Sequence, residues 1–101
     1  MFIYSADRAA QDYESVTVST TAIGITGSKM NKGSNPCVAA FITVEDANIR
    51  FRIDGEAPTT TEGHQLKNGQ NLTLASPADV RNFLAIRDDA VDATLRVTLR
   101  Y

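Results

Sequence analysis

Apolar and polar residues alternate along most of the chain, which is the pattern of strands that bury one face and expose the other. The alternation is clearest over residues 94–101, where leucine, valine and tyrosine share one face and threonine and arginine the other. Residues 49–53 repeat it, with apolar side chains inward and two arginines outward. We therefore expect both segments to be strands.

Other segments rich in apolar and β-branched residues have the length of strands. These are 16–20, 22–26, 38–45, 64–66, 70–75 and 83–87. Asp46-Ala47-Asn48 and the pair Asn68 and Gly69 accept turn geometry, so each predicts a hairpin between the strands that it joins. A third hairpin is expected to join 83–87 to 94–101. Phe41, Phe51 and Tyr101 are assigned to the core.

Helix signals are few. Ser76 followed by Pro77 is an N-cap with proline at the first helical position, which predicts one helical turn over 76–82. Residues 24–36, rich in glycine and polar residues, indicate a long loop, and 1–14 a possible N-terminal arm. Loop and arm are both candidates for partner contact.

These elements predict one domain over residues 1–101. The fold class is all-β: a β-sandwich or small jelly roll of about seven to eight strands, with at most one short helical turn. A sheet of this kind has edges that are either capped or paired with another subunit, so we expect a homo-oligomer, a dimer or trimer.

Composition narrows the class of partner. The formal net charge of −2 gives no basic excess, and no alternating aromatic platform is present, so nucleic-acid binding is not expected. The first residues carry no basic segment and only a short apolar run, so no secretory signal is expected. The longest internal apolar run, 37–42, is far too short for a membrane helix. Cys37, the one cysteine, is expected to be a packed, unreactive thiol.

No catalytic set emerges from the sequence. His64 is the only histidine, and we interpret it as a turn or strand-edge residue. One histidine and one cysteine are too few for a structural zinc site. Asp88, Asp89 and Asp92 could hold a cation but lack EF-hand spacing, and a solvated connection is the simpler interpretation. We expect no enzyme and no cofactor.

Two further motif matches are accidental. Residues 24–29 superficially resemble a phosphate loop, but the serine precedes the lysine. Residues 71–73 spell a glycosylation sequon without an export signal.

Basic side chains offer the best interface candidates. Arg50 and Arg52 leave one strand on the same side, and Arg96 and Arg100 leave another on its polar side. If the two strands are neighbours, the four guanidinium groups form one patch suited to carboxylate partners. The alternative is a solvated outer face balanced by acidic residues such as Glu45. Lys29 and Lys32, in the long loop, are further candidates.

Residues 49–59, followed by Glu62-Gly63-His64, resemble a pattern found in small proteins encoded among the head genes of tailed bacteriophages. There, a strand runs into Asp-Gly-x-x-Pro-Thr, then Gly-His, a short turn and a strand like 72–74. Strands resembling 82–87 and 93–101 follow, so the resemblance covers about 38–101. Asp54, Gly55 and Pro58, like Asn68 and Gly69, have structural turn roles in this reading.

The resemblance implies a virion structural protein that is assembled in the host cytoplasm and binds the major capsid protein or other virion proteins. A capsid decoration or cement protein is the leading hypothesis, and a head-tail joining component is an alternative. A similar turn occurs in sugar-binding β-sandwich modules of some glycosidases, which is the second alternative. Such modules need exposed aromatic rings, and this chain has no Trp.

Overall fold

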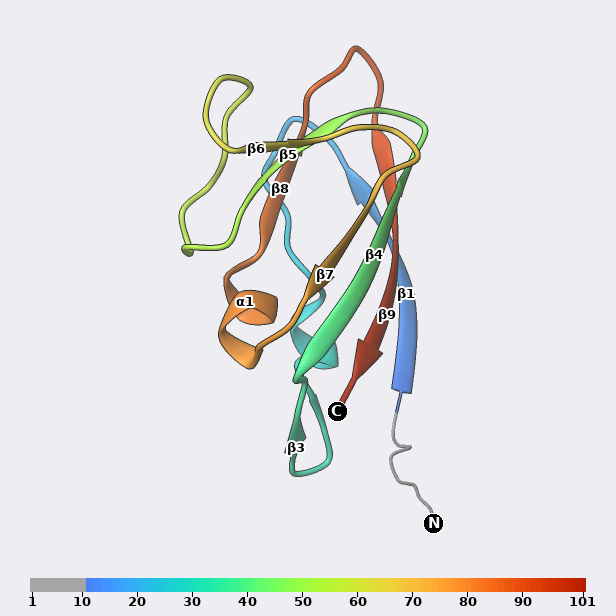
Figure 1. Cartoon of the computed structure of the whole chain (residues 1–101), viewed down its shortest axis with the longest axis vertical. Helices are drawn as coiled ribbons and strands as arrows, with labels where there is room; N and C mark the ends of the chain where they lie inside the picture. The colour runs from blue at the N-terminus through green and yellow to red at the C-terminus, as the bar shows by residue number, and fades with distance from the viewer. Residues whose placement is uncertain (1–10) are drawn as a thin grey trace.

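The computed structural model describes residues 11–101, which form two packed antiparallel sheets (Figure 1). Sheet A has the strand order β1 (Gln11–Val18), β9 (Ala93–Arg100), β4 (Ala39–Glu45) and β7 (Asn71–Leu74). Sheet B has the order β6 (His64–Leu66), β5 (Ile49–Arg52) and β8 (Leu84–Arg87). A small ribbon pairs β2 (Asn31–Lys32) with β3 (Asn35–Pro36). The predicted all-β sandwich is confirmed.

The period-two pattern explains the core. Along β9, alternate residues from Ala93 to Leu99 are almost completely buried, and β4 contributes Ala40, Ile42 and Val44 in the same way. Sheet B faces them with Ile49 and other apolar side chains. Burial of this apolar surface is the main stabilising contribution to the fold. The residues between the buried ones point outward, so each sheet also has an outer face on which most residues are polar.

The predicted helical turn is confirmed as α1 (Pro77–Asn82). The Ser76 side chain accepts a hydrogen bond from the Asp79 amide at 3.2 Å, and Pro77 occupies the first turn. Val80 anchors the helix in the core. A single 3-10 turn, η2 (Gly27–Lys29), is added within the long loop. Among residues 11–101, no helix has the length and apolar character needed to span a bilayer.

The largest differences from the predicted strand boundaries lie in the N-terminal part of the chain. Residues 11–14, assigned to a possible arm, form the first half of β1, so that part of the prediction is wrong; residues 1–10 lie outside the described residues. Their polar character misled because this half of the edge strand buries none of its side chains fully. The predicted strand over 22–26 is reduced to one bridge, between Ile23 and Ala85.

All three predicted hairpins are wrong, because each connection crosses between the sheets. β4 belongs to sheet A and β5 to sheet B, and the same change of sheet separates β6 from β7 and β8 from β9. The crossings meet around Asn48. Its side-chain oxygen accepts from the Asn68 amide at 2.9 Å, and its carbonyl accepts from the Asp88 amide at 2.8 Å. These bonds satisfy the Asn68 and Asp88 amides, which in a hairpin would be paired by the opposite strand.

Candidate functional site

The predicted patch of four arginines does not exist. Arg50 and Arg52 lie on the outer face of sheet B, whereas Arg96 and Arg100 lie on the outer face of sheet A. The two faces point away from each other across the sandwich. The prediction required β5 and β9 to be neighbours, and the crossing at residues 46–48 places them in different sheets.

Arg50 has a structural role on sheet B. Its Nε lies 3.1 Å from Asp88 Oδ2, and its Nη1 donates to the Gly63 carbonyl at 3.1 Å. Gln65 donates to the same Asp88 oxygen at 3.2 Å. Both members of the ion pair are mostly shielded from water. Arg50 therefore ties β5 to two connections and offers little to a partner.

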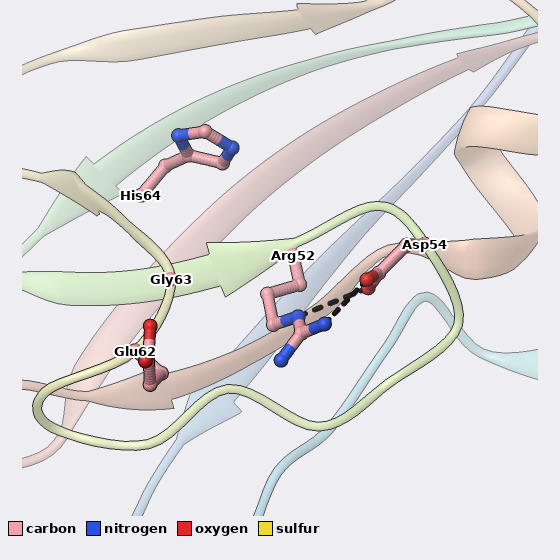
Figure 2. Close-up of a pocket in the computed structure, with 5 residues that line it drawn as sticks. All are labelled: Arg52, Asp54, Glu62, Gly63 and His64. Atoms are coloured by element: carbon pink, nitrogen blue, oxygen red, sulfur yellow. Dashed lines mark hydrogen bonds and ion pairs between the residues drawn. The ribbon is translucent and has the colours of Figure 1, made fainter.

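Arg52 lines an open hollow of about 580 Å³ together with Asp54, Glu62, Gly63 and His64 (Figure 2). Its guanidinium group points at Asp54 and donates to both carboxylate oxygens. This pairing lowers the pKa of Asp54 below its ordinary value. The guanidinium charge is thus largely matched within the chain.

His64 is the first residue of β6, at the edge of sheet B, where the sequence placed it. Its ring lies 5.4 Å from the Phe51 ring, centroid to centroid. Figure 2 shows the imidazole apart from the paired Arg52 and Asp54 side chains. The residues of 11–101 that line the hollow with His64 are Arg52, Asp54, Glu62 and Gly63, which are charged or without a side chain.

The turn residues hold the loop beside this hollow. Gly55 has a φ of +85°, the left-handed region that disfavours a β-branched side chain. Pro58 is buried, and a Cβ at Gly63 would lie 3.1 Å from both the Phe51 carbonyl and Pro58. The Asn68-Gly69 turn is similar, with a φ of +90° at Gly69. These positions shape the backbone and carry no reactive group.

The two lysine candidates are bound to the chain's own first strand. Lys29 Nζ lies 3.0 Å from Asp12 Oδ2, and Lys32 Nζ donates to the Gln11 carbonyl at 3.2 Å. The Asp12 carboxylate also accepts from the Tyr13 amide at 2.8 Å, and this bond, with that from Lys29, lowers its pKa. The loop over residues 24–36 is therefore docked on β1.

The three aspartates near the last crossing are also engaged. Asp88 pairs with Arg50, Asp92 pairs with Arg87 at 2.6 Å, and Asp89 accepts from the Ala90 amide at 2.9 Å. Within residues 11–101, no cluster of His, Cys, Asp or Glu has metal-binding geometry. Cys37 is buried and its thiol donates to the Ala39 carbonyl at 3.3 Å, which confirms that it is packed.

The feature that the sequence reading missed lies on the outer face of sheet A. Tyr13 is 54% exposed and Phe41 is 45% exposed, and both are register partners of Thr98, which lies between them on β9. Neighbouring strands are about 4.8 Å apart, so the two aromatic side chains leave the sheet about 10 Å from each other. Arg96 and Arg100 precede and follow Thr98 on the same face. We call these five residues the β9 patch.

Arg96 is fixed within the patch by its neighbours. Its Nε lies 3.2 Å from Glu45 Oε1, and its Nη1 donates to Ser15 Oγ at 2.8 Å. The Tyr13 hydroxyl lies 3.3 Å from the same Ser15 oxygen, a contact that lowers the pKa of Tyr13. The Arg96 side chain is still 44% exposed, so it is oriented by these contacts and remains accessible.

A closer reading of the alternation would have found Phe41. Ala40, Ile42 and Val44 are the buried residues of β4, so period two places Phe41 outward. The continuous apolar run hid this, and the assignment of Phe41 to the core is wrong. Tyr13 was hidden in the segment assigned to the arm. Phe51 is buried as expected, and Tyr101 is partly buried with its hydroxyl donating to the Lys29 carbonyl at 2.7 Å.

No protein-family model matches this chain. The curated proteins and the solved structures contain no match either.

Proposed function

We propose that the protein is a non-enzymatic structural component of a tailed-bacteriophage particle, a decoration or cement protein that binds the capsid surface as an oligomer. The observation that carries the proposal is the β9 patch. Exposed tyrosine, phenylalanine and arginine on one rigid surface are the residue types enriched where proteins bind one another. The resemblance of residues 38–101 to head-gene proteins is the reason for proposing a phage capsid as the partner.

Sheet A suits such docking because its outer face is a regular surface. Its register places the aromatic residues and Thr98 in one row, with Ser15, Arg96, Thr43 and Asn71 in the next. The strand backbone is already ordered, so little backbone conformational entropy is lost when a partner binds. Arg96, oriented by Glu45 and Ser15, is placed to reach a carboxylate on a capsid subunit.

The test combines location with binding. Mass spectrometry of purified particles of the encoding phage is expected to find the protein at a stoichiometry comparable to capsid subunits. Purified protein is expected to bind capsids that lack it. The double variant Tyr13→Thr with Phe41→Thr should weaken that binding by roughly a thousandfold, because hot-spot aromatics each contribute about 2 kcal/mol and every factor of ten in affinity corresponds to about 1.4 kcal/mol. Absence from the particle would overturn the proposal.

Val91 supplies the matched control. It is 54% exposed, like Tyr13, but lies in the connection between β8 and β9, away from sheet A's outer face. Val91→Thr should leave capsid binding unchanged. Equal losses from the control and from the aromatic variants would mean that the β9 patch is not the docking surface. Labelled protein found only at the head-tail junction would favour the joining role.

The sugar-binding alternative gains support from the same two rings. Aromatic rings stack on sugars, and Tyr13 and Phe41 are two exposed aromatic rings on one face. Composition alone did not predict them. Affinity electrophoresis in soluble polysaccharides separates the two functions. Retardation that disappears in Tyr13→Thr, together with absence from the particle, would replace the capsid proposal with a glycan-binding one.

A further inference from the structure

The edge of sheet A at β1 differs from the other edges in length. β1 has eight residues, whereas the edge strands β7 and β6 have four and three. Within the described residues β1 pairs only with β9, so one side of its backbone has no strand beside it. A long edge strand of this kind is a template for pairing with another chain.

The register shows which backbone groups face that edge. In an antiparallel ladder, alternate residues bond to opposite neighbours. Val44 bonds to the turn before β7, because its amide donates to Gln70 at 3.0 Å and its carbonyl accepts from Gly69 at 2.8 Å. Thr43 and Glu45 therefore bond to β9, at Arg96 and Thr94.

The same alternation continues across β9. If Arg96 bonds to β4, Leu95 and Val97 bond to β1, at Val16 and Glu14. Tyr13, Ser15 and Thr17 consequently direct their amides and carbonyls toward the open edge. Two side-chain bonds fit this assignment, because each satisfies a backbone group at the open edge. Lys32 donates to the Gln11 carbonyl, and the Asp12 carboxylate accepts from the Tyr13 amide. We call these two bonds the caps.

These caps close only one end of the edge. Beyond the other end the chain leaves sheet A, where the Ser19 carbonyl accepts from the Arg87 amide at 3.0 Å. Between the two, the edge groups of Ser15 and Thr17 make no backbone hydrogen bond with the part of the chain that the structure describes. The open stretch is thus short, central and bounded at both ends.

We infer that β1 pairs antiparallel with β1 of a second copy, around a two-fold axis at Ser15. This register opposes Ser15 to Ser15 and Tyr13 to Thr17. The Ser15 backbone groups can bond to each other, and each Thr17 amide can donate to the Tyr13 carbonyl of the other copy, without displacing the Asp12 cap from the Tyr13 amide. On the inner face the register opposes Glu14 to Val16, so no like charges meet. A second copy offers the same open stretch of strand, and two copies paired in this register form an isologous dimer.

The inference deepens the proposed function and rests on its oligomeric part. Antiparallel pairing keeps outward residues outward, so sheet A of both copies becomes one continuous surface with two β9 patches. Two patches on a rigid unit can bind neighbouring capsid subunits together, and the second contact benefits from effective concentration.

Charged substitutions at Ser15 test whether the two-fold axis passes through this residue. Ser15→Lys and Ser15→Glu each place like charges opposite each other, and we expect each variant to dimerise roughly tenfold or more weakly than the wild-type chain by light scattering. An equimolar mixture should recover a heterodimer, since the opposed charges then attract. Dimerisation of the mixture no stronger than that of either variant would overturn the Ser15 register.

Two controls separate this result from misfolding or loss of side-chain contacts. Ser15→Ala removes the bonds to Arg96 and Tyr13 without adding charge, and Asn71→Lys adds charge on the opposite edge strand. Both should remain dimers. A wild-type chain that is monomeric at high concentration would overturn both the inference and the oligomeric part of the proposed function. Ser15→Lys as strongly dimeric as wild type would overturn the β1 interface alone, and capsid binding by monomeric Ser15→Lys would leave the docking proposal intact.

Discussion

The outer faces of the two sheets use arginine in different ways. On sheet B, Arg50 is bound to the shielded Asp88, and Arg52 pairs with the exposed Asp54 in a hollow that no tyrosine or phenylalanine of residues 11–101 lines. On sheet A, Arg96 is oriented by Glu45 but stays accessible beside two exposed aromatic rings. The sequence pattern is the same on both, with polar residues alternating with buried ones. An interaction surface is therefore identified by what its side chains leave exposed, and charge count alone does not locate it.

The largest expected effect is on the loop beside sheet B. Gly55→Val should destabilise the fold by about 1–3 kcal/mol, because a β-branched residue is strained at positive φ. Urea unfolding measures this. Gly27→Val is the matched control, since Gly27 lacks positive φ and a Cβ there meets nothing within 4 Å. Equal stability of Gly55→Val and the wild-type chain would refute the turn geometry.

The next largest effect is the difference in stability between variants of Arg50 and Arg96. Arg50→Ala is expected to cost about 1–2 kcal/mol, because it leaves the shielded Asp88 and the Gly63 carbonyl without their donor. Arg96→Ala should cost about 0–1 kcal/mol, since its pair with Glu45 is exposed. Thermal and urea unfolding of both variants compare the faces directly. A larger loss for Arg96→Ala would reverse the roles assigned to the two sheets.

A smaller effect is expected from the exposed rings. Tyr13→Thr and Phe41→Thr should change stability by no more than about 0.5 kcal/mol, because neither side chain packs in the core and threonine suits a strand. Their capsid binding should fall nonetheless. If stability and binding fell in parallel, the aromatic residues would be supporting the fold rather than a partner surface.

The smallest effect is a dependence on pH. The folded-state pKa of Asp54 is lowered by Arg52, so the pair stabilises the protein above the unfolded pKa of about 3.9. That stability is lost as the pH falls through the folded-state value. Asp54→Asn should therefore melt below the wild-type chain at pH 6, and the two melting curves should converge toward pH 2. A constant difference would mean that the pairing contributes nothing.

Local pattern predicted most of the strands and the helical turn α1. Residues 38–45, 49–53 and 83–87 are strands within a residue or two, and Ser76 with Pro77 begins α1 as expected. Such features depend on side-chain alternation and capping, which act over a few residues. The candidate site was predicted only in part, since Arg96 and Arg100 belong to the β9 patch but Tyr13 and Phe41 were assigned elsewhere.

By itself, the sequence determined the all-β class, the buried faces of β5 and β9 and the turns at Gly55 and Gly69. The tertiary structure alone decided which sheet each strand joins. A short connection such as 46–48 can close a hairpin or cross between facing sheets, and the difference depends on long-range contacts such as those around Asn48. That choice set Arg50 and Arg96 on opposite faces and placed Tyr13 and Phe41 on either side of Thr98. Alternation determines which side of its strand a residue occupies. Only the packing of distant strands determines which surface of the molecule that side belongs to.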